Sequence, residues 1–243
     1  AQELIALPIP GEHVARTVED IAALARAANI PSTCTDSAQS ALQALAAQVL
    51  GVAETVIAEL QVFKRSFDAR KADLRVVYIV DLRLHDQALQ TELLQRLHQH
   101  PHVSASPDMV WRPPPRFKAT ASPDSTRPIV VGFGPCGMFA ALVLAQMGFK
   151  PLVIERGKPV RQRTKDTWDL WRRSQLHRES NVQFGEGGAG TFSDGKLYSQ
   201  IKDPRHLGRK VMEELVRFGA PEDILFAAHP HVGTFKLVKV VEG

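Results

Sequence analysis

Apolar side chains recur at helical spacing in two stretches of the first hundred residues. The first stretch is followed by Gly51, a residue suited to ending a helix, and the second is preceded by Asp86, a residue suited to beginning one. We therefore predict one helix that carries Leu42, Leu45, Ala46 and Val49, and another that carries Leu89, Leu93 and Leu97.

Between these helices the period changes to two, which is typical of half-buried strands. Ala58, Leu60 and Val62 alternate with Glu59 and Gln61, and a second alternation follows, formed by Val76, Tyr78, Val80 and Leu82. With a first strand near residues 4–9 and a short strand near Val103, the order is βαββαβ. This order predicts a ferredoxin-like α+β module over residues 1–110, with an additional amphipathic segment at residues 14–27.

Proline-rich sequence separates this module from the rest. Residues 111–127 include three consecutive prolines and a later Ser-Pro-Asp-Ser run, which exclude a helix or a central strand. We interpret them as an extended linker. Beyond it, residues 128–133, 137–147 and 150–155 read as strand, helix and strand. Residues 128–243 are therefore predicted to form an α/β domain of the Rossmann type.

A G-x-G-x-x-G motif joins the first strand of this domain to its helix. Gly132 permits the tight turn, Gly134 lets the backbone approach a pyrophosphate, and Gly137 lets helix and strand pack closely. Glu155 lies 23 residues after Gly132 at the end of the second strand, where an acid accepts hydrogen bonds from a ribose. The motif in this context predicts binding of a dinucleotide.

A second glycine-rich segment favours FAD over NAD. Five of the eleven residues from Gly185 to Gly195 are glycine, interleaved with Thr191 and Ser193 and followed by Lys196. Exposed main-chain amides and hydroxyls of this kind can line a long polar ligand. The alternative, a surface loop, is less consistent with Phe184, Phe192 and Leu197 within the same stretch.

These motifs resemble the two-part FAD site of the glutathione-reductase-like flavoproteins. Residues 163–166 and 181–202, with 63–66 and 68–71 in the first module, are also similar to the bacterial FAD-dependent dehydrogenases called NAD(FAD)-utilising dehydrogenases. The resemblance covers most of residues 55–243. It implies an FAD-dependent oxidoreductase whose substrate is an unassigned small molecule, with NAD(P)H as a candidate electron donor.

The resemblance also implies roles for individual residues. Glu155 would contact the adenosine ribose, Arg156 would lie beside the adenine end, and Lys196 would come near the isoalloxazine. The remaining implied FAD contacts are Gly132, Gly134, Pro135 and Gly137 at the pyrophosphate, and Gly187, Gly188, Gly190 and Thr191 at the pyrophosphate or ribityl chain.

Composition and charge narrow these expectations only slightly. The chain of 243 residues has a formal charge of +4 and 44% hydrophobic residues, and it has no apolar run long enough for a membrane span. Two widely spaced cysteines, Cys34 and Cys136, fit a reducing compartment, so we expect a cytoplasmic protein. The absence of cysteine after Gly137 excludes a dithiol-disulfide reductase.

Two further expectations concern completeness and an alternative function. No later strand follows Glu155 in the pattern, so we expect the chain to be the N-terminal part of a longer flavoenzyme that holds FAD incompletely by itself. The alternative is a nucleic-acid-binding or regulatory protein that uses the basic hairpin of Lys64, Arg65, Arg70, Lys71 and Arg75. The paired aromatic residues that RNA-recognition modules use for stacking are missing there. We therefore expect neither a nucleic acid nor a membrane as partner.

Overall fold

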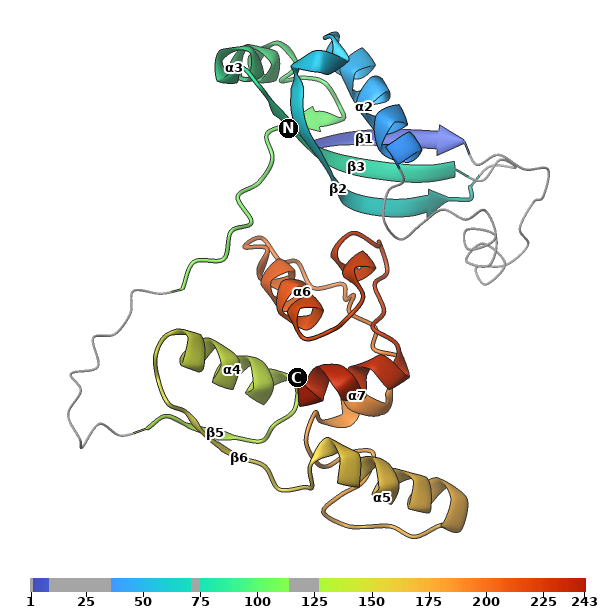
Figure 1. The fold of residues 1–243 in the computed structure, drawn as a ribbon, viewed down its shortest axis with the longest axis vertical. Helices are drawn as coiled ribbons and strands as arrows, with labels where there is room; N and C mark the ends of the chain where they lie inside the picture. The colour runs from blue at the N-terminus through green and yellow to red at the C-terminus, as the bar shows by residue number, and fades with distance from the viewer. Residues whose placement is uncertain (1, 9–35, 71–74, 114–126) are drawn as a thin grey trace. The chain divides into compact units, whose positions relative to one another are not determined.

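The computed structural model describes residues 2–8, 36–70, 75–113 and 127–243 (Figure 1). The described chain divides into two compact units. The first comprises residues 1–108 with 225–228, and the second comprises residues 109–224 with 229–243. The predicted segment at residues 14–27 and most of the predicted linker lie outside the described residues.

The described part of the first unit forms a four-stranded sheet with two helices. The strands are β1 (Gln2–Pro8), β2 (Ile57–Asp68), β3 (Arg75–Leu84) and β4 (Val103–Ser104), in the spatial order β2-β3-β1-β4 with antiparallel pairing throughout. The helices α2 (Asp36–Leu50) and α3 (Gln87–Arg96) pack on one core with the strands. A short 3₁₀ turn, η1 (Glu54–Val56), precedes β2.

Strand β3 supplies the centre of this core because every second side chain is buried. Val76, Tyr78, Val80 and Leu82, which were predicted to share a face, are all buried, and Val80 is fully inaccessible. The carboxylate of Asp86 accepts a hydrogen bond from the Ala88 amide at 2.8 Å, which confirms Asp86 as the N-cap of α3.

The predicted inner face of α2 needs one correction. Leu42 and Ala46 are fully buried, but Val49 is 40% exposed, and Ala47 and Leu50 are buried in its place. The buried stripe of α2 is thus displaced toward its last residues, before the chain turns at Gly51, whose φ is +67°. Together these elements make the first unit a mixed α and β structure.

In the described residues, the second unit contains a two-stranded parallel ribbon and four further helices. Strands β5 (Ile129–Val131) and β6 (Leu152–Ile154) pair in parallel and are connected through α4 (Pro135–Gln146). The later helices are α5 (Val160–Arg173), α6 (Leu207–Arg217) and α7 (Thr234–Glu242), with 3₁₀ turns η2 (Ala189–Phe192) and η3 (Glu222–Leu225). Among the described residues no helix is both long enough and apolar enough to cross a membrane.

Two features of this unit differ from the sequence-based expectation. Helix α4 begins at Pro135, two residues earlier than predicted. The apolar face that its sequence indicates includes Ala145, but this residue is exposed. Helix α5 was not predicted at all. Its buried positions follow helical spacing, but three of the four are polar: Val160, Arg163, Asp166 and Thr167.

Candidate nucleotide-binding site

The turn between β5 and α4 has the geometry that the G-x-G-x-x-G motif requires. Gly132 has a φ of +89°, and its amide donates to the carbonyl oxygen of Ile154 at 2.7 Å. Gly134 is the N-cap of α4 and Pro135 is its first residue. A side chain at Gly137 would overlap the carbonyl oxygen of Gly132, so the helix can lie this close to the turn only with glycine there.

The first amides of α4 are directed away from the helix and have no partner inside it. No side chain caps this end within the described residues. Amides in this position, together with the helix dipole, make an electropositive site that suits phosphate.

Glu155 joins the turn to the segment that follows β6. One carboxylate oxygen accepts a hydrogen bond from the Phe133 amide at 2.6 Å, and the other accepts from the Gly157 amide at 2.8 Å. The carboxylate therefore holds both loops in place. Because each oxygen has a second lone pair, it can still accept a hydrogen bond from a hydroxyl of a ligand.

The second glycine segment lies directly against the first. The Gly187 amide donates to the Phe133 carbonyl oxygen at 2.8 Å. A Cβ placed on Gly188 would lie 2.9 Å from the Cα of Gly134 and 3.0 Å from Cδ of Pro135. Both Gly187 and Gly188 have positive φ, at +87° and +70°. The two motifs, which are about 50 residues apart in sequence, thus form one continuous main-chain surface.

The predicted residues Thr191 and Gly190 are placed differently from this surface. Thr191 is only 1% exposed, and its hydroxyl accepts a hydrogen bond from Nη1 of Arg163 at 3.4 Å, so it supports the loop from inside. Gly190 is exposed, and a side chain there would meet no atom within 4 Å.

The predicted residues Arg156 and Lys196 each have a partner of their own. Arg156 forms a two-pronged ion pair with Glu179 and lies over the Phe184 ring at 4.6 Å. This pair raises the pKa of Arg156 and lowers that of Glu179, mainly through the side-chain hydrogen bond. Lys196 is exposed and lies 3.6 Å from the carboxylate of Asp194.

Sequence reasoning missed a cluster of aromatic and basic residues around Lys196. A bridge between Lys196 and His231 brings two distant segments together. The Tyr198 ring meets the rings of His229 and His231 edge-on, with centroids 4.7 and 5.9 Å away. No spacing in the sequence indicates this contact, because it depends on the pairing of the two segments.

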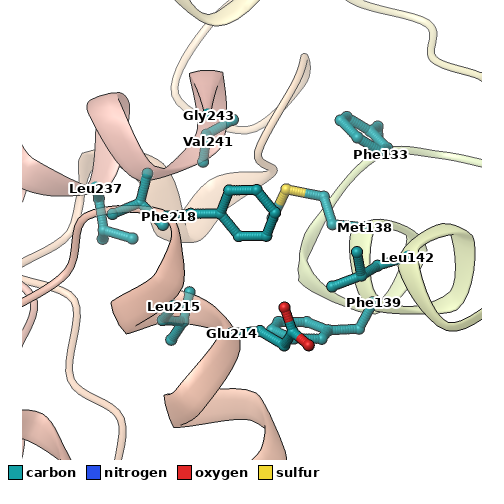
Figure 2. Close-up of a pocket in the computed structure, with 11 residues that line it drawn as sticks. Phe133, Met138, Phe139, Leu142, Glu214, Leu215, Phe218, Leu237, Val241 and Gly243 are labelled. Atoms are coloured by element: carbon teal, nitrogen blue, oxygen red, sulfur yellow. The ribbon is translucent and has the colours of Figure 1, made fainter. Parts of the chain in front are cut away.

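An apolar cavity of about 190 Å³ lies beside the turn at Gly132–Gly137 and is lined by residues of α4, α6 and α7 (Figure 2). Phe133, Met138, Phe218 and Leu237 supply much of its wall. Its carboxylate, Glu214, is 4% exposed and accepts a hydrogen bond from Gln146 at 2.8 Å as well as one from Lys210. Burial by itself would raise the pKa of Glu214, but these two hydrogen bonds and the Lys210 charge hold it below its usual range.

A metal centre is not indicated. The described residues contain no group of three or more His, Cys, Asp or Glu side chains arranged to hold a metal ion. His98, His100 and His102, the alternating histidines near the end of α3, make local contacts: His98 bonds the Gln95 carbonyl oxygen at 2.9 Å, and the rings of the other two meet edge-on.

Comparison with known proteins gives two similarities. Residues 25–83 match a family described as a domain of unknown function, DUF8436. Over 204 residues, 79% of this chain, the sequence is 41% identical to an uncharacterized protein of Clostridium beijerinckii. The matched region is 35% of that protein, so the chain spans about a third of the length of this relative.

Proposed function

We propose that this chain is the nucleotide-binding part of an FAD-dependent oxidoreductase, with a ferredoxin-like module followed by a Rossmann-type domain. The observation that supports it most is the contact between the two glycine segments, through Gly187 with Phe133 and Gly188 with Gly134. FAD is a long ligand with a diphosphate at its centre, and it needs close main-chain approach over more than one loop.

The residues present fit this cofactor. Gly188 packs so closely on Gly134 that a Cβ on Gly188 would lie 2.9 Å from the Cα of Gly134, so bare main chain lies next to the uncapped N-terminus of α4. In this proposal Gly134, Pro135, Gly137, Gly187 and Gly188 hold the diphosphate, and Glu155 accepts a ribose hydroxyl while it braces the turn. When bound, FAD supplies hydride and electron transfer, and the chain contributes binding and orientation.

The strand order of the first unit, β2-β3-β1-β4, supports the ferredoxin-like part of the proposal. The parallel β5 and β6 with α4 between them support the Rossmann-type part.

No observation favours the nucleic-acid alternative. On the described part of the basic hairpin, Arg70 is held by both carboxylate oxygens of Asp68 at 2.8 and 2.7 Å, which leaves its guanidinium less able to bind phosphate.

Titration with FAD and with ADP tests the proposal. Gly134 has a φ of −79°, and a Cβ there would lie 3.7 Å from the nearest atom, so Gly134→Ala should fold normally. It should nevertheless lower the affinity for FAD and for ADP by about tenfold or more, because the methyl group occupies the space that the diphosphate needs. Flavin fluorescence measures FAD binding, and calorimetry measures ADP binding.

Ala140→Ser, an exposed change on the same helix, is the matched control and should bind like the unmodified chain. If neither FAD nor ADP shows saturable binding, or if Gly134→Ala binds as tightly as the control, the proposal is wrong.

A further inference from the structure

Arg163 is the largest fully buried side chain of the molecule among the described residues. It lies on α5, in the buried polar stripe with Asp166 and Thr167, and it is 0% exposed. A fully buried guanidinium is uncommon because removing its charge from water costs free energy. Its contacts therefore need to be considered one by one.

Every hydrogen bond that the Arg163 side chain makes within the described residues is to residues 181–191, the loop that contains the start of the second glycine segment. Nε donates to the Asn181 carbonyl oxygen and Nη2 to that of Val182, both at 2.7 Å. Nη1 donates to the Glu186 carbonyl oxygen at 2.7 Å and to the Thr191 hydroxyl at 3.4 Å. The planar fork of one guanidinium thus holds both sides of the loop, which a lysine ammonium could not do.

The loop is shaped to receive this side chain. Gly185 has a φ of +122°, and a Cβ at this position would lie 2.5 Å from Cδ of Arg163. The Phe192 ring packs on the guanidinium at 4.8 Å from its centroid. Arg163 therefore fills the interior of the loop. On the side of the α4 turn, the Gly187 amide donates to Phe133 and the Cα of Gly188 packs against Gly134.

The charge of Arg163 lacks a carboxylate partner at ion-pair distance among the described residues, and its acceptors are neutral oxygens. Burial lowers the pKa of the guanidinium, and the charge of Glu155 opposes that shift. An anion bound where the two glycine segments meet would stabilise the buried charge further.

We propose that Arg163 is a positioning residue that holds residues 181–191 in the shape required by a diphosphate-containing ligand. This inference rests on the proposed function for the identity of the ligand, but the shaping of the loop is independent of any ligand.

Hydrogen exchange on the 243-residue chain, without ligand, tests the shaping. Arg163→Met and Arg163→Lys should both lose amide protection in residues 181–191, with the methionine variant losing more, while the first unit keeps its protection. Arg173→Met is the control, because Arg173 lies on the same helix but is exposed and pairs with Asp169 of that helix at 3.4 Å. It should leave the loop unchanged.

Binding of ADP compared with adenosine tests the link to the diphosphate. The Arg163 variants should lower the affinity for ADP by about tenfold or more and change the affinity for adenosine little. The reason is that, of the two ligands, only ADP has the diphosphate that would contact residues 181–191. A general loss of structure would weaken both ligands equally.

The outcomes separate the two proposals. If the unmodified chain does not bind ADP, the proposed function is wrong. The hydrogen-exchange protection of residues 181–191 then still decides whether Arg163 shapes the loop. Unchanged protection of residues 181–191 in the Arg163 variants overturns the inference. Loss of protection throughout the second unit in both variants also overturns it, because Arg163 would then serve general stability.

Discussion

The first unit and the glycine-rich part of the second unit bury different kinds of side chain, although the second unit also has a small apolar core around Ile224 and Val240. In the first, alternate residues of β3 and the inner residues of α2 form an apolar core in which Leu42 and Val80 are completely inaccessible. In the second, the strand residues Ile129 and Val131 are 61% and 81% exposed, while Arg163 and Thr167 are fully buried. The first unit is thus organised by apolar packing, and the glycine-rich part of the second by hydrogen bonds to main chain.

This difference determines how strictly each interior constrains its residues. An apolar core tolerates exchange among residues of similar volume, whereas a polar interior requires that each donor meet its acceptor. The loops of the second unit are therefore held in one arrangement by a small number of residues that few substitutions could replace.

Truncation in the core gives the sharpest contrast between the units. Leu42→Ala should lower the free energy of unfolding of the first unit by about 2–5 kcal/mol, because it removes buried volume that the surroundings cannot refill. Val131→Thr, at a position 81% exposed, should change the second unit by less than about 0.5 kcal/mol. Urea denaturation followed by circular dichroism measures both. If both substitutions lowered the free energy of unfolding equally, the contrast between an apolar core and an exposed strand would be wrong.

A single methyl group tests the close contact in the second unit. Gly137→Ala should lower the free energy of unfolding of that unit by about 1–3 kcal/mol, since its Cβ would overlap the Gly132 carbonyl oxygen and force the helix from the turn. Cys136→Ala, at the preceding exposed position, should be nearly neutral. Thermal unfolding of the two variants distinguishes a steric effect from a change in helix propensity.

Acid should weaken the second unit through its buried carboxylates. The pKa of Glu214 in the folded chain lies below its ordinary value of 4.5, so the stabilisation is fully present above that value. It is lost as the pH falls below 4.5 toward the folded pKa. Asp166 behaves in the same way: burial would raise its pKa, but the hydrogen bond from Lys158 and its charge lower it overall.

Glu214→Gln should therefore reduce the loss of stability of this unit between neutral and acidic pH, compared with the unmodified chain. Urea midpoints at several pH values measure the effect. The same pH dependence in both proteins would show that Glu214 does not contribute.

The smallest effect is expected at a surface pair of the first unit. Arg70 and Asp68 are joined by two hydrogen bonds, which lower the pKa of Asp68, but the Arg70 side chain is 88% exposed. Arg70→Ala should not measurably shift the urea midpoint, because solvent screens exposed ion pairs. A clear shift would mean that burial is a poor guide to which arginines stabilise this chain.

Apolar periodicity predicted the first unit well because burial there follows apolar residues. The alternation Val76, Tyr78, Val80 and Leu82 and the cap at Asp86 are both present. The same reasoning missed α5, whose buried stripe is mostly polar. A hydrophobic pattern cannot reveal a helix that buries Arg163 and Asp166.

The candidate site was predictable in its parts and not in its assembly. Glycine spacing indicated the turn at Gly132–Gly137 and the segment at Gly187–Gly188, but the contact of Gly188 with Gly134 involves residues without side chains. Contacts between bare main-chain segments leave no periodic trace in the sequence. Thr191 was predicted to contact the ligand because it lies among these glycines, but its hydroxyl is turned inward to Arg163. The sequence does not show which way a side chain in this loop points.

The ribbon of β5 and β6 has a consequence for handling the protein. Ile129, Val131, Leu152 and Ile154 are each between 42% and 81% exposed, on strands whose described pairing is only with each other. Apolar strands with free edges favour pairing between copies of a chain, so self-association should increase with concentration. Dilute samples and low temperature, which weakens apolar contacts, are the conditions that keep such copies apart.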